Sequence, residues 1–246
     1  MDAKNTIITG GTSGIGFEIA STLAKRGDNL LLVYLSDDPK AQAALNELQT
    51  LNPSIKIFCE KFNLSTNDGI TNFIKFANKT FNGKIDHLIS CHGRVSPGLF
   101  INKSATEILA TMTEHLLSNV LITHAVLESM IKNRYGRIIY LTSMTSSKIR
   151  QGMSDYSISK HALESLAQNL ASEYFKYNIT LNCIRSGMAE TPLTTNYINN
   201  FNENTDGSIV SKTIIANLVE LITSDPSCSF NGSTIPVDGG QFVCNR

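Results

Sequence analysis

The chain has 246 residues, of which 41% are hydrophobic and 17% charged, and its formal net charge is zero. This length and composition are typical of a globular protein with a substantial core, and they exclude a disordered or fibrous chain. The balanced charge offers no basic footprint for nucleic acid and no polybasic segment for a membrane surface, and no apolar window is long enough for a membrane span. Neither nucleic acid nor a membrane is therefore expected as a partner.

The five cysteines are an odd number, and none lies in a CxxC pair. They are interpreted as small buried residues in a reducing compartment, rather than a disulfide framework or a zinc site. His115, His124 and His161 are interpreted as helix-surface or packing residues, so no metal is expected. The first residues, MDAKNTIITG, contain no apolar stretch typical of a signal peptide. These features predict a cytoplasmic protein.

Short apolar runs alternate with longer helical patterns along the chain. Ile15, Ile19 and Leu23 repeat on one face of the first helical pattern, as in a helix packed on a sheet. The predicted strands are 6–9, 30–35, 55–59, 87–91, 137–141, 180–184 and 234–237, and the predicted helices are 14–26, 39–51, 66–81, 104–133, 154–176 and 209–224. Apolar strands alternating with helices predict a single α/β domain over 1–246, a Rossmann-type doubly wound sheet of about seven parallel strands with helices on both faces.

The segment 191–208 interrupts this alternation. It is rich in Asn and Thr and too long for a simple connection, and no linker, low-complexity tract or internal repeat divides the chain. The segment is therefore predicted to be a mobile lid over a site rather than a domain boundary. Substrate specificity is expected to come from 191–208 and from 94–101.

A glycine-rich turn, TGGTSGIG, follows the first predicted strand and opens the first predicted helix. In that position Gly10 permits a tight turn, Gly14 lets the backbone approach a pyrophosphate, and Gly16 lets the helix pack closely on the strand. The N–H groups and the positive dipole at the helix start would then hold the phosphates. The motif predicts a dinucleotide site; the alternative is a plain strand–helix turn.

Tyr156 and Lys160 lie four residues apart in the run YSISK. Residues at this spacing share one face of a helix. A tyrosine titrates near ~10 and is a poor acid or base at neutral pH, whereas a cation about 4 Å away lowers that pKa. The pair therefore predicts a proton-transfer group; the alternative is a surface Tyr–Lys contact on an amphipathic helix.

The glycine turn and YSISK together resemble the short-chain dehydrogenase/reductase family. The resemblance covers nearly the whole chain and extends to Asn119 in LLSNVLITH, to Ser143 in YLTSM, and to the runs GMAETPL and NGSTIPVDGG. It implies hydride exchange between a nicotinamide and a carbonyl or secondary alcohol. Tyr156 would transfer the proton, and Lys160 would lower the Tyr156 pKa and hold the nicotinamide ribose. Ser143 would bind the substrate oxygen, and Asn119 would anchor a water leading to Lys160, with local backbone bonding as the alternative for both.

The same resemblance implies a set of cofactor contacts. They are Gly10, Thr12, Ser13, Gly14, Ile15, Gly16, Tyr34, Ser36, Asn63, Leu64, Gly93, Tyr156, Lys160, Gly187, Ala189 and Thr191. Three positions depart from the family pattern. His92, in SCHG, stands in place of an alanine near the cofactor ribose, Asn63 in place of an aspartate near adenine, and Ser186 in place of the proline of a PG turn. These changes concern cofactor affinity and loop rigidity rather than the chemistry.

The expected cofactor is NADP(H) rather than NAD(H). Tyr34, Leu35 and Ser36 stand where an acid would hydrogen-bond the ribose 2′-hydroxyl of NAD. Without that carboxylate a 2′-phosphate is not repelled, and Ser36 could receive it. Against this choice, no arginine occupies a phosphate-clamping position, and Asp37 and Asp38 lie nearby.

Most of the chain resembles bacterial 3-oxoacyl thioester reductases, which implies a carbonyl or acyl thioester substrate, with an acyl carrier protein as a candidate partner. Basic residues are expected to form a cluster that meets this acidic carrier. They are Arg94, Lys132, Arg134, Lys148 and Arg150. Two alternatives stay open: an NAD-dependent dehydrogenase of a secondary alcohol or sugar, and a non-catalytic dinucleotide-binding sensor or assembly protein. Family members with this architecture are usually tetramers, so a homotetramer is expected.

Overall fold

The computed structural model describes residues 3–192, 194–198 and 207–243. Seven strands form one parallel sheet: β1 Asn5–Thr9, β2 Asn29–Tyr34, β3 Ile57–Lys61, β4 His87–Ser90, β5 Gly136–Ser143, β6 Ile179–Ser186 and β7 Thr234–Val237. The α-helices are α1 Gly14–Arg26, α2 Asp38–Leu51, α3 Asn67–Thr80, α4 Ala105–Met112, α5 Ser118–Asn133, α6 Ser154–Tyr174, α7 Thr195–Ile198 and α9 Lys212–Ser224. Short 3₁₀ turns occupy Phe100–Asn102, Met144–Ser146 and Phe175–Tyr177.

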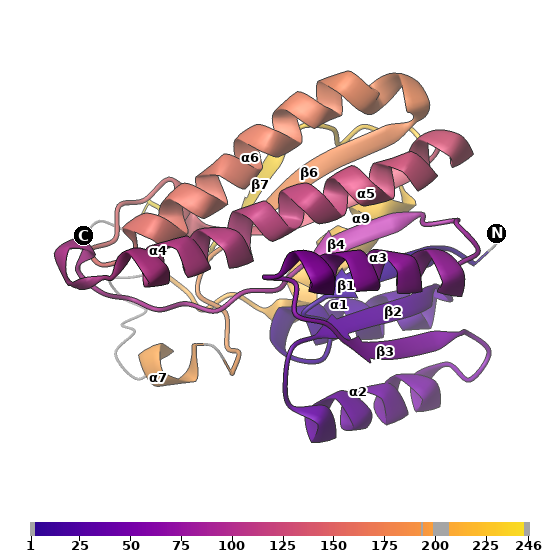
Figure 1. The fold of residues 1–246 in the computed structure, drawn as a ribbon, viewed down its shortest axis with the longest axis horizontal. Coiled ribbons are helices and arrows are strands. Elements are labelled where there is room, and N and C mark those ends of the chain that lie inside the picture. The colour runs from indigo at the N-terminus through magenta and orange to yellow at the C-terminus, as the bar shows by residue number, and fades with distance from the viewer. Residues whose placement is uncertain (1–2, 193, 199–206, 244–246) are drawn as a thin grey trace.

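The strand order is β3-β2-β1-β4-β5-β6-β7. The chain first runs from β1 outward to β3 and then returns, so β4 pairs with β1, as Thr6 opposite His87 shows. At this reversal the loops that follow β1 and β4 diverge, and sheets of this type bind ligands there. The carboxyl ends of the strands lie at the end of the molecule that carries α4 and α7 (Figure 1).

Each face of the sheet has its own apolar core, because successive strand residues point to opposite faces. Ile7 belongs to the core under α3, α5 and α6, and Ile8 to the core under α1, α2 and α9. Figure 1 shows α3, α5 and α6 in front of the sheet and α1 and α9 behind it. The predicted Rossmann-type sheet with helices on both faces is confirmed. None of the described helices has the length and apolar character that a membrane span requires.

The predicted helix 104–133 is confirmed in extent, because residues 105–133 are helical throughout, but it is not a uniform α-helix. A π-helical turn, Thr113–Leu117, separates α4 from α5. A π-helical turn shifts the phase of the apolar stripe by about one residue, and apolar periodicity alone does not distinguish such a shift from an irregular stripe on one α-helix. The lid predicted at 191–208 includes 193 and 199–206, which lie outside the described residues, so that prediction and the single-domain prediction stay untested.

A largely buried ion pair, Arg26–Asp28, lies at the amino end of β2. Asp28 accepts hydrogen bonds from Arg26 Nη2 (2.6 Å) and Thr6 Oγ1 (2.6 Å), and His87 Nδ1 lies 3.4 Å away. Burial acts to raise the pKa of Asp28, but the bonds from His87 and Arg26 outweigh it and lower the pKa to about 2. This carboxylate therefore stabilises the fold above the pKa of the unfolded chain.

Because the pKa of Asp28 is lower in the folded than in the unfolded protein, its contribution to stability should be lost as the pH falls from the unfolded pKa to the folded pKa. The free energy of unfolding should decrease by about 2 kcal/mol from this group between about pH 5 and pH 2. Asp28→Asn should be less stable at pH 7 and should lose this part of the pH dependence. Urea denaturation at a series of pH values checks it; an unchanged slope in Asp28→Asn would contradict the assignment.

Candidate active site

The glycine turn joins β1 directly to α1. Gly10 has φ 67°, a conformation that favours glycine, and its N–H donates to Val33 O (2.8 Å). A Cβ on Gly16 would lie 2.2 Å from Gly10 O, so no other residue fits while the turn keeps this shape. Ser13, at the N-cap of α1, makes no side-chain cap, and the first turn contains no acidic residue. The N–H groups of this helix start therefore suit an anionic group such as a phosphate.

A cavity of about 360 Å³ extends from this turn across the ends of β2 and β3. The predicted cofactor residues that line it are Gly10, Thr12, Ser13, Gly14, Ile15, Gly16, Tyr34, Ser36, Asn63, Leu64, Gly93 and Thr191. Lys40, which sequence reasoning missed, lines it too. The start of α1, which suits a phosphate, and the residues that line this cavity together fit a dinucleotide.

A second cavity, of about 320 Å³, adjoins the first and shares Ile15, Gly93 and Thr191 with it. The predicted site residues that line it are Ser143, Tyr156, Lys160, Gly187 and Ala189. These residues come from the carboxyl ends of β5 and β6 and from the first turns of α6. The ends of β5 and β6 and the start of α6 therefore lie beside the glycine turn, at one end of the sheet.

Ser143 ends β5, and its hydroxyl faces Tyr156. Ser143 Oγ accepts hydrogen bonds from Thr145 N (3.2 Å) and Thr145 Oγ1 (3.0 Å). A hydroxyl has two acceptor lone pairs and one proton, so these two bonds leave the Ser143 proton to be donated. The Ser143 hydroxyl also acts to lower the pKa of Tyr156, and both residues line the second cavity. The two hydroxyls converge in the second cavity.

Tyr156 and Lys160 share a face of α6, as expected, and burial shifts the pKa of each. Burial raises the pKa of Tyr156 to about 12, with the Ser143 hydrogen bond acting in the opposite direction. Lys160 Nζ donates to Leu141 O (2.9 Å) and lies 5.7 Å from the centre of the Tyr156 ring. In this arrangement burial and Ser143 set the direction of the Tyr156 pKa and the ammonium is bonded to Leu141, so the lowering of that pKa by Lys160 stays a prediction. Burial also lowers the pKa of Lys160 to about 8.

Asn119 lies behind the cavity wall, at the start of α5 and just after the π-helical turn. Its side chain is 2% exposed, Nδ2 donates to His115 O (2.8 Å), and Oδ1 accepts from Ser90 Oγ. The local backbone bond considered as an alternative is therefore present. The water-anchoring role of Asn119 stays a prediction.

His92, the unusual residue of SCHG, is half-buried, lines both cavities and hydrogen-bonds to β1 and α5. Its Nδ1 lies 2.7 Å from Thr9 Oγ1 and its Nε2 2.8 Å from Ser118 Oγ. Ser118 Oγ donates to Glu114 O (2.7 Å), so it must accept from His92 Nε2–H. Burial lowers the pKa of His92 to about 4, so the ring is neutral at pH 7. The ring therefore stiffens the loop after β4.

His115 packs directly against Tyr156, a contact that sequence reasoning missed. The two ring centres are 4.8 Å apart and the rings are nearly perpendicular. His115 Nε2 lies 2.6 Å from Arg94 O, and burial lowers the pKa to about 3, so a neutral ring donates through Nε2–H. A Cβ on Gly93 would lie 2.1 Å from His115 Cε1. His115 is therefore a packing residue, as predicted. Its position one helical turn before Asn119 could have indicated from the sequence that it lies near the site.

The predicted basic cluster does not form one surface. Arg94 and Arg150 line the two cavities, and Lys148 Nζ donates to Gln241 O. Lys132 and Arg134 lie instead at the carboxyl end of α5, beside the amino end of β5 and so at the opposite end of the sheet (Figure 1). The prediction of a single cluster is wrong, because the sequence does not show which end of an element faces the site.

Residues 4–202 match the family model described as short chain dehydrogenase. The chain belongs to the short chain dehydrogenase family. It is 28% identical over 252 residues to the 3-oxoacyl-[acyl-carrier-protein] reductase FabG of Rickettsia felis, covering 99% of this chain and 98% of that protein. The structure of acetoin dehydrogenase YohF from Salmonella typhimurium is 26% identical, with a TM-score of 0.88 and coverage of 99% and 98%. Levodione reductase is 24% identical and has the same fold, with a TM-score of 0.91 over 98% of both chains.

Membership of the short chain dehydrogenase family makes the protein an oxidoreductase of CH–OH and C=O groups that uses a nicotinamide cofactor. The resemblance stated from the motifs is thereby confirmed.

Proposed function

We propose that this short chain dehydrogenase is an NADP(H)-dependent reductase of a 3-oxoacyl thioester. The observation that carries the proposal is the convergence of the Ser143 and Tyr156 hydroxyls in a cavity that continues the dinucleotide cradle. The near full-length similarity to the Rickettsia felis protein, named a 3-oxoacyl-[acyl-carrier-protein] reductase, supports the substrate class.

In this mechanism a bound nicotinamide supplies the hydride to the carbonyl carbon. Ser143 donates its remaining hydroxyl proton as a hydrogen bond to the carbonyl oxygen, which stabilises the charge that develops there. Tyr156 then donates its phenolic proton to the alkoxide. A phenol with a pKa of about 12 is fully protonated at neutral pH, so the acid needed for reduction is present before the reaction. Lys160 would hold the nicotinamide ribose.

The apolar part of the second cavity keeps water away from this proton transfer. Val95, Pro97, Met144 and Met153 contribute to its walls, and Arg150 lies at the same cavity. Low polarity around Ser143 and Tyr156 strengthens their hydrogen bonds to the substrate oxygen. The geometry therefore favours a carbonyl with an apolar substituent and a polar or charged group toward Arg150.

Lys40 supports the choice of NADP(H). Asp37 caps α2 by accepting from Lys40 N (3.2 Å), and Asp38 pairs with Lys61 (3.1 Å) and accepts from the Tyr34 hydroxyl. Both carboxylates therefore have partners, and Lys40 lines the cofactor cavity together with Asp37. We expect the Lys40 ammonium to form an ion pair with the 2′-phosphate of NADP(H).

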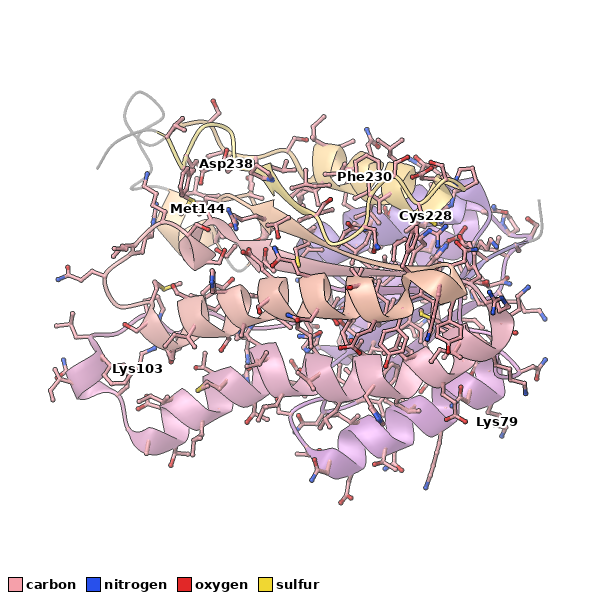
Figure 2. All side chains as sticks on the ribbon, turned by 90° about the horizontal axis from the view of Figure 1, so that it is seen from above. Lys79, Lys103, Met144, Cys228, Phe230 and Asp238 are labelled. Atoms are coloured by element: carbon pink, nitrogen blue, oxygen red, sulfur yellow. The ribbon has the colours of Figure 1, made fainter. Side chains whose placement is uncertain are left out.

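Replacing Lys40 with Ala should raise the KM for NADPH by ~5-fold and the KM for NADH by less than ~2-fold, because a half-exposed cation beside a phosphate is worth about 1 kcal/mol. Lys79→Ala, on an exposed position of α3 at the far end of the molecule, is the control (Figure 2). Initial rates with both cofactors check it. Equal changes for NADPH and NADH would show that Lys40 does not read the 2′-phosphate.

The test of the substrate class is a comparison of 3-oxoacyl thioesters with simple ketones, acyloins and ketoses, each with NADPH and with NADH. The nicotinamide absorbance reports turnover. The proposal expects the largest kcat/KM with a 3-oxoacyl thioester and NADPH. A larger value for an acyloin or sugar with NAD(H) would favour the second candidate, an NAD-dependent secondary-alcohol dehydrogenase, which the similarity to an acetoin dehydrogenase supports.

An acyl carrier protein stays part of the proposal because Arg94 lines the first cavity and Arg150 lines the second. Its acidic surface would be attracted by these guanidinium groups, an attraction that salt weakens. The KM of a carrier-bound substrate should therefore rise with ionic strength, whereas the KM of a free thioester should not. Identical salt dependence for both substrates would remove the carrier from the proposal.

We also propose a cytoplasmic homotetramer assembled through α4, α5 and α6. Leu109, Leu117, Leu121 and Ile158 are exposed apolar side chains on these helices and on the π-helical turn between α4 and α5. Their burial between copies would remove this apolar surface from water. Light scattering coupled to size-exclusion chromatography measures the mass.

A further inference from the structure

A buried ion pair joins the rim of the second cavity to the helix that carries Tyr156. The rim is the segment 94–103, between β4 and α4, and Val95 and Pro97 of this rim line the cavity. Lys103 Nζ, at the end of the rim, lies 2.6 Å from Asp155 Oδ1 and 2.8 Å from Oδ2. The two side chains are 8% and 1% exposed. Figure 2 shows Lys103 at the same end of the molecule as Met144, the residue after Ser143.

Asp155 lies at the start of the helix that carries Tyr156. The first N–H groups of a helix lack partners within the helix, and Met153 at the N-cap of α6 provides no side-chain cap. Asp155 stands in the first turn of α6, directly before Tyr156, and Lys103 Nζ donates to both of its carboxylate oxygens. Burial acts to raise the pKa of Asp155, but hydrogen bonding, with that from Lys103 first, outweighs it and holds the pKa below its ordinary value. A carboxylate in the first helical turn is also favoured by the helix dipole.

A second tie joins the same rim to the loop 147–153 that precedes α6. Gly98 N donates to Gly152 O (2.9 Å). Gly152 has φ 79°, and a Cβ there would lie 3.2 Å from Gly98 N, so the close approach requires glycine. The rim is thus fixed at two points, Gly98 and Lys103, both of which follow the cavity-lining residues Val95 and Pro97 in the chain.

We propose that Lys103 and Asp155 are positioning residues for carbonyl reduction. They hold the rim and the backbone of Tyr156 in one geometry, so that a substrate seated against the rim presents its oxygen to the Tyr156 hydroxyl. The inference rests on the proposed function, in which Tyr156 transfers the proton. Displacing a reacting group by about 1 Å costs up to ~100-fold in rate, so a tie of this kind affects turnover without touching the substrate.

A purely stabilising role is the competing explanation, and the chain offers a matched comparison for it. Arg26 and Asp28 form another buried ion pair, with an N–O distance of 2.6 Å, at the amino end of the sheet. Removing one partner of a buried pair leaves an uncompensated charge and destabilises the fold in either place. Among the ion pairs of the described residues, only Lys103–Asp155 includes a residue of the first turn of α6, next to Tyr156.

The experiment compares Lys103→Met, Asp155→Asn, the double variant, Lys103→Arg and Asp28→Asn, at a temperature where all are folded. Lys103→Met should lower kcat/KM for the ketone by ~10-fold or more, through kcat as well as KM, while the dissociation constant of NADPH changes by less than ~2-fold. The double variant should lose no more than the worse single variant, because the two residues act as one unit. Lys103→Arg should retain most of the activity, and Asp28→Asn should keep the wild-type kcat.

Hydrogen exchange gives a readout that does not need turnover. In Lys103→Met the amides of 94–103 and of 154–160 should both exchange faster, and in Asp28→Asn neither should change beyond the global loss of stability. A Lys103→Met enzyme whose kcat falls no more than that of Asp28→Asn, or whose faster exchange is confined to 94–103, would overturn the proposal. A wild-type protein that reduces no carbonyl compound would instead refute the proposed function, and the exchange data would still decide whether the rim and Tyr156 are coupled.

Discussion

Tyr156→Phe should lower kcat for ketone reduction by at least ~10³-fold and leave the affinity for the nicotinamide cofactor within ~2-fold of wild type. The phenolic proton is the one that neutralises the developing alkoxide, and a positioned general acid contributes ~10²–10⁴-fold. Phenylalanine retains the ring, so the perpendicular contact with His115 at 4.8 Å is preserved. The loss should therefore come from the missing hydroxyl and not from repacking.

Tyr140→Phe is the matched control for that variant. Tyr140 is fully buried, its hydroxyl lies 2.6 Å from Thr123 Oγ1, and it is absent from both cavities. Its removal should cost stability through one lost buried hydrogen bond and leave kcat unchanged. Steady-state rates measure kcat, and fluorescence titration with NADPH measures the cofactor affinity, for both variants. Activity that survives in Tyr156→Phe at a level near wild type would exclude Tyr156 as the proton donor.

Lys160→Met should lower kcat/KM for reduction by ~10²-fold, because the charge that orders the ribose and supports proton transfer is removed. The variant should also change the pH dependence. Burial lowers the pKa of Lys160 to about 8, so the ammonium is charged below that pH and loses its proton above it. The wild-type kcat/KM should therefore fall as pH rises through about 8.

Methionine nearly matches the length of lysine, so the buried stem position next to Leu141 stays filled in Lys160→Met. The descending limb near pH 8 should be absent from the profile of this variant. Rates measured from pH 6 to 10, with saturating cofactor, decide the point. A limb that persists unchanged in Lys160→Met would assign it to another group.

Local chemistry explains what the sequence predicted well. A turn with glycines at Gly10 and Gly16 has few alternatives when a strand precedes it and a helix follows, so the cofactor end of the sheet could be predicted from the sequence. The strands were predicted because continuous apolar runs indicate burial on both faces, and the parallel order followed from their alternation with helices. Tyr156 and Lys160 were found by spacing and Ser143 by the family resemblance, and the structure gathers the three around one cavity.

Features that depend on packing could not be predicted in the same way. His115 looked like an ordinary helix residue, because burial against Tyr156 arises only when α6 packs on the π-helical turn. The raised pKa of Tyr156 depends on desolvation by neighbours that are distant in sequence. Lys103 and Asp155 are 52 residues apart, and no spacing rule connects them.

Deuterium transfer from NADPH labelled at the nicotinamide C4 tests the proposed chemistry most directly. The wild-type protein is incubated with the labelled cofactor and a 3-oxoacyl thioester, and the product is analysed by mass spectrometry and NMR. Deuterium on the carbinol carbon, with the transfer abolished in Tyr156→Phe and retained in Tyr140→Phe, is the expected result. Tight cofactor binding without deuterium transfer to this or any other carbonyl substrate would contradict it, and would point instead to a dinucleotide-binding protein that does not catalyse reduction.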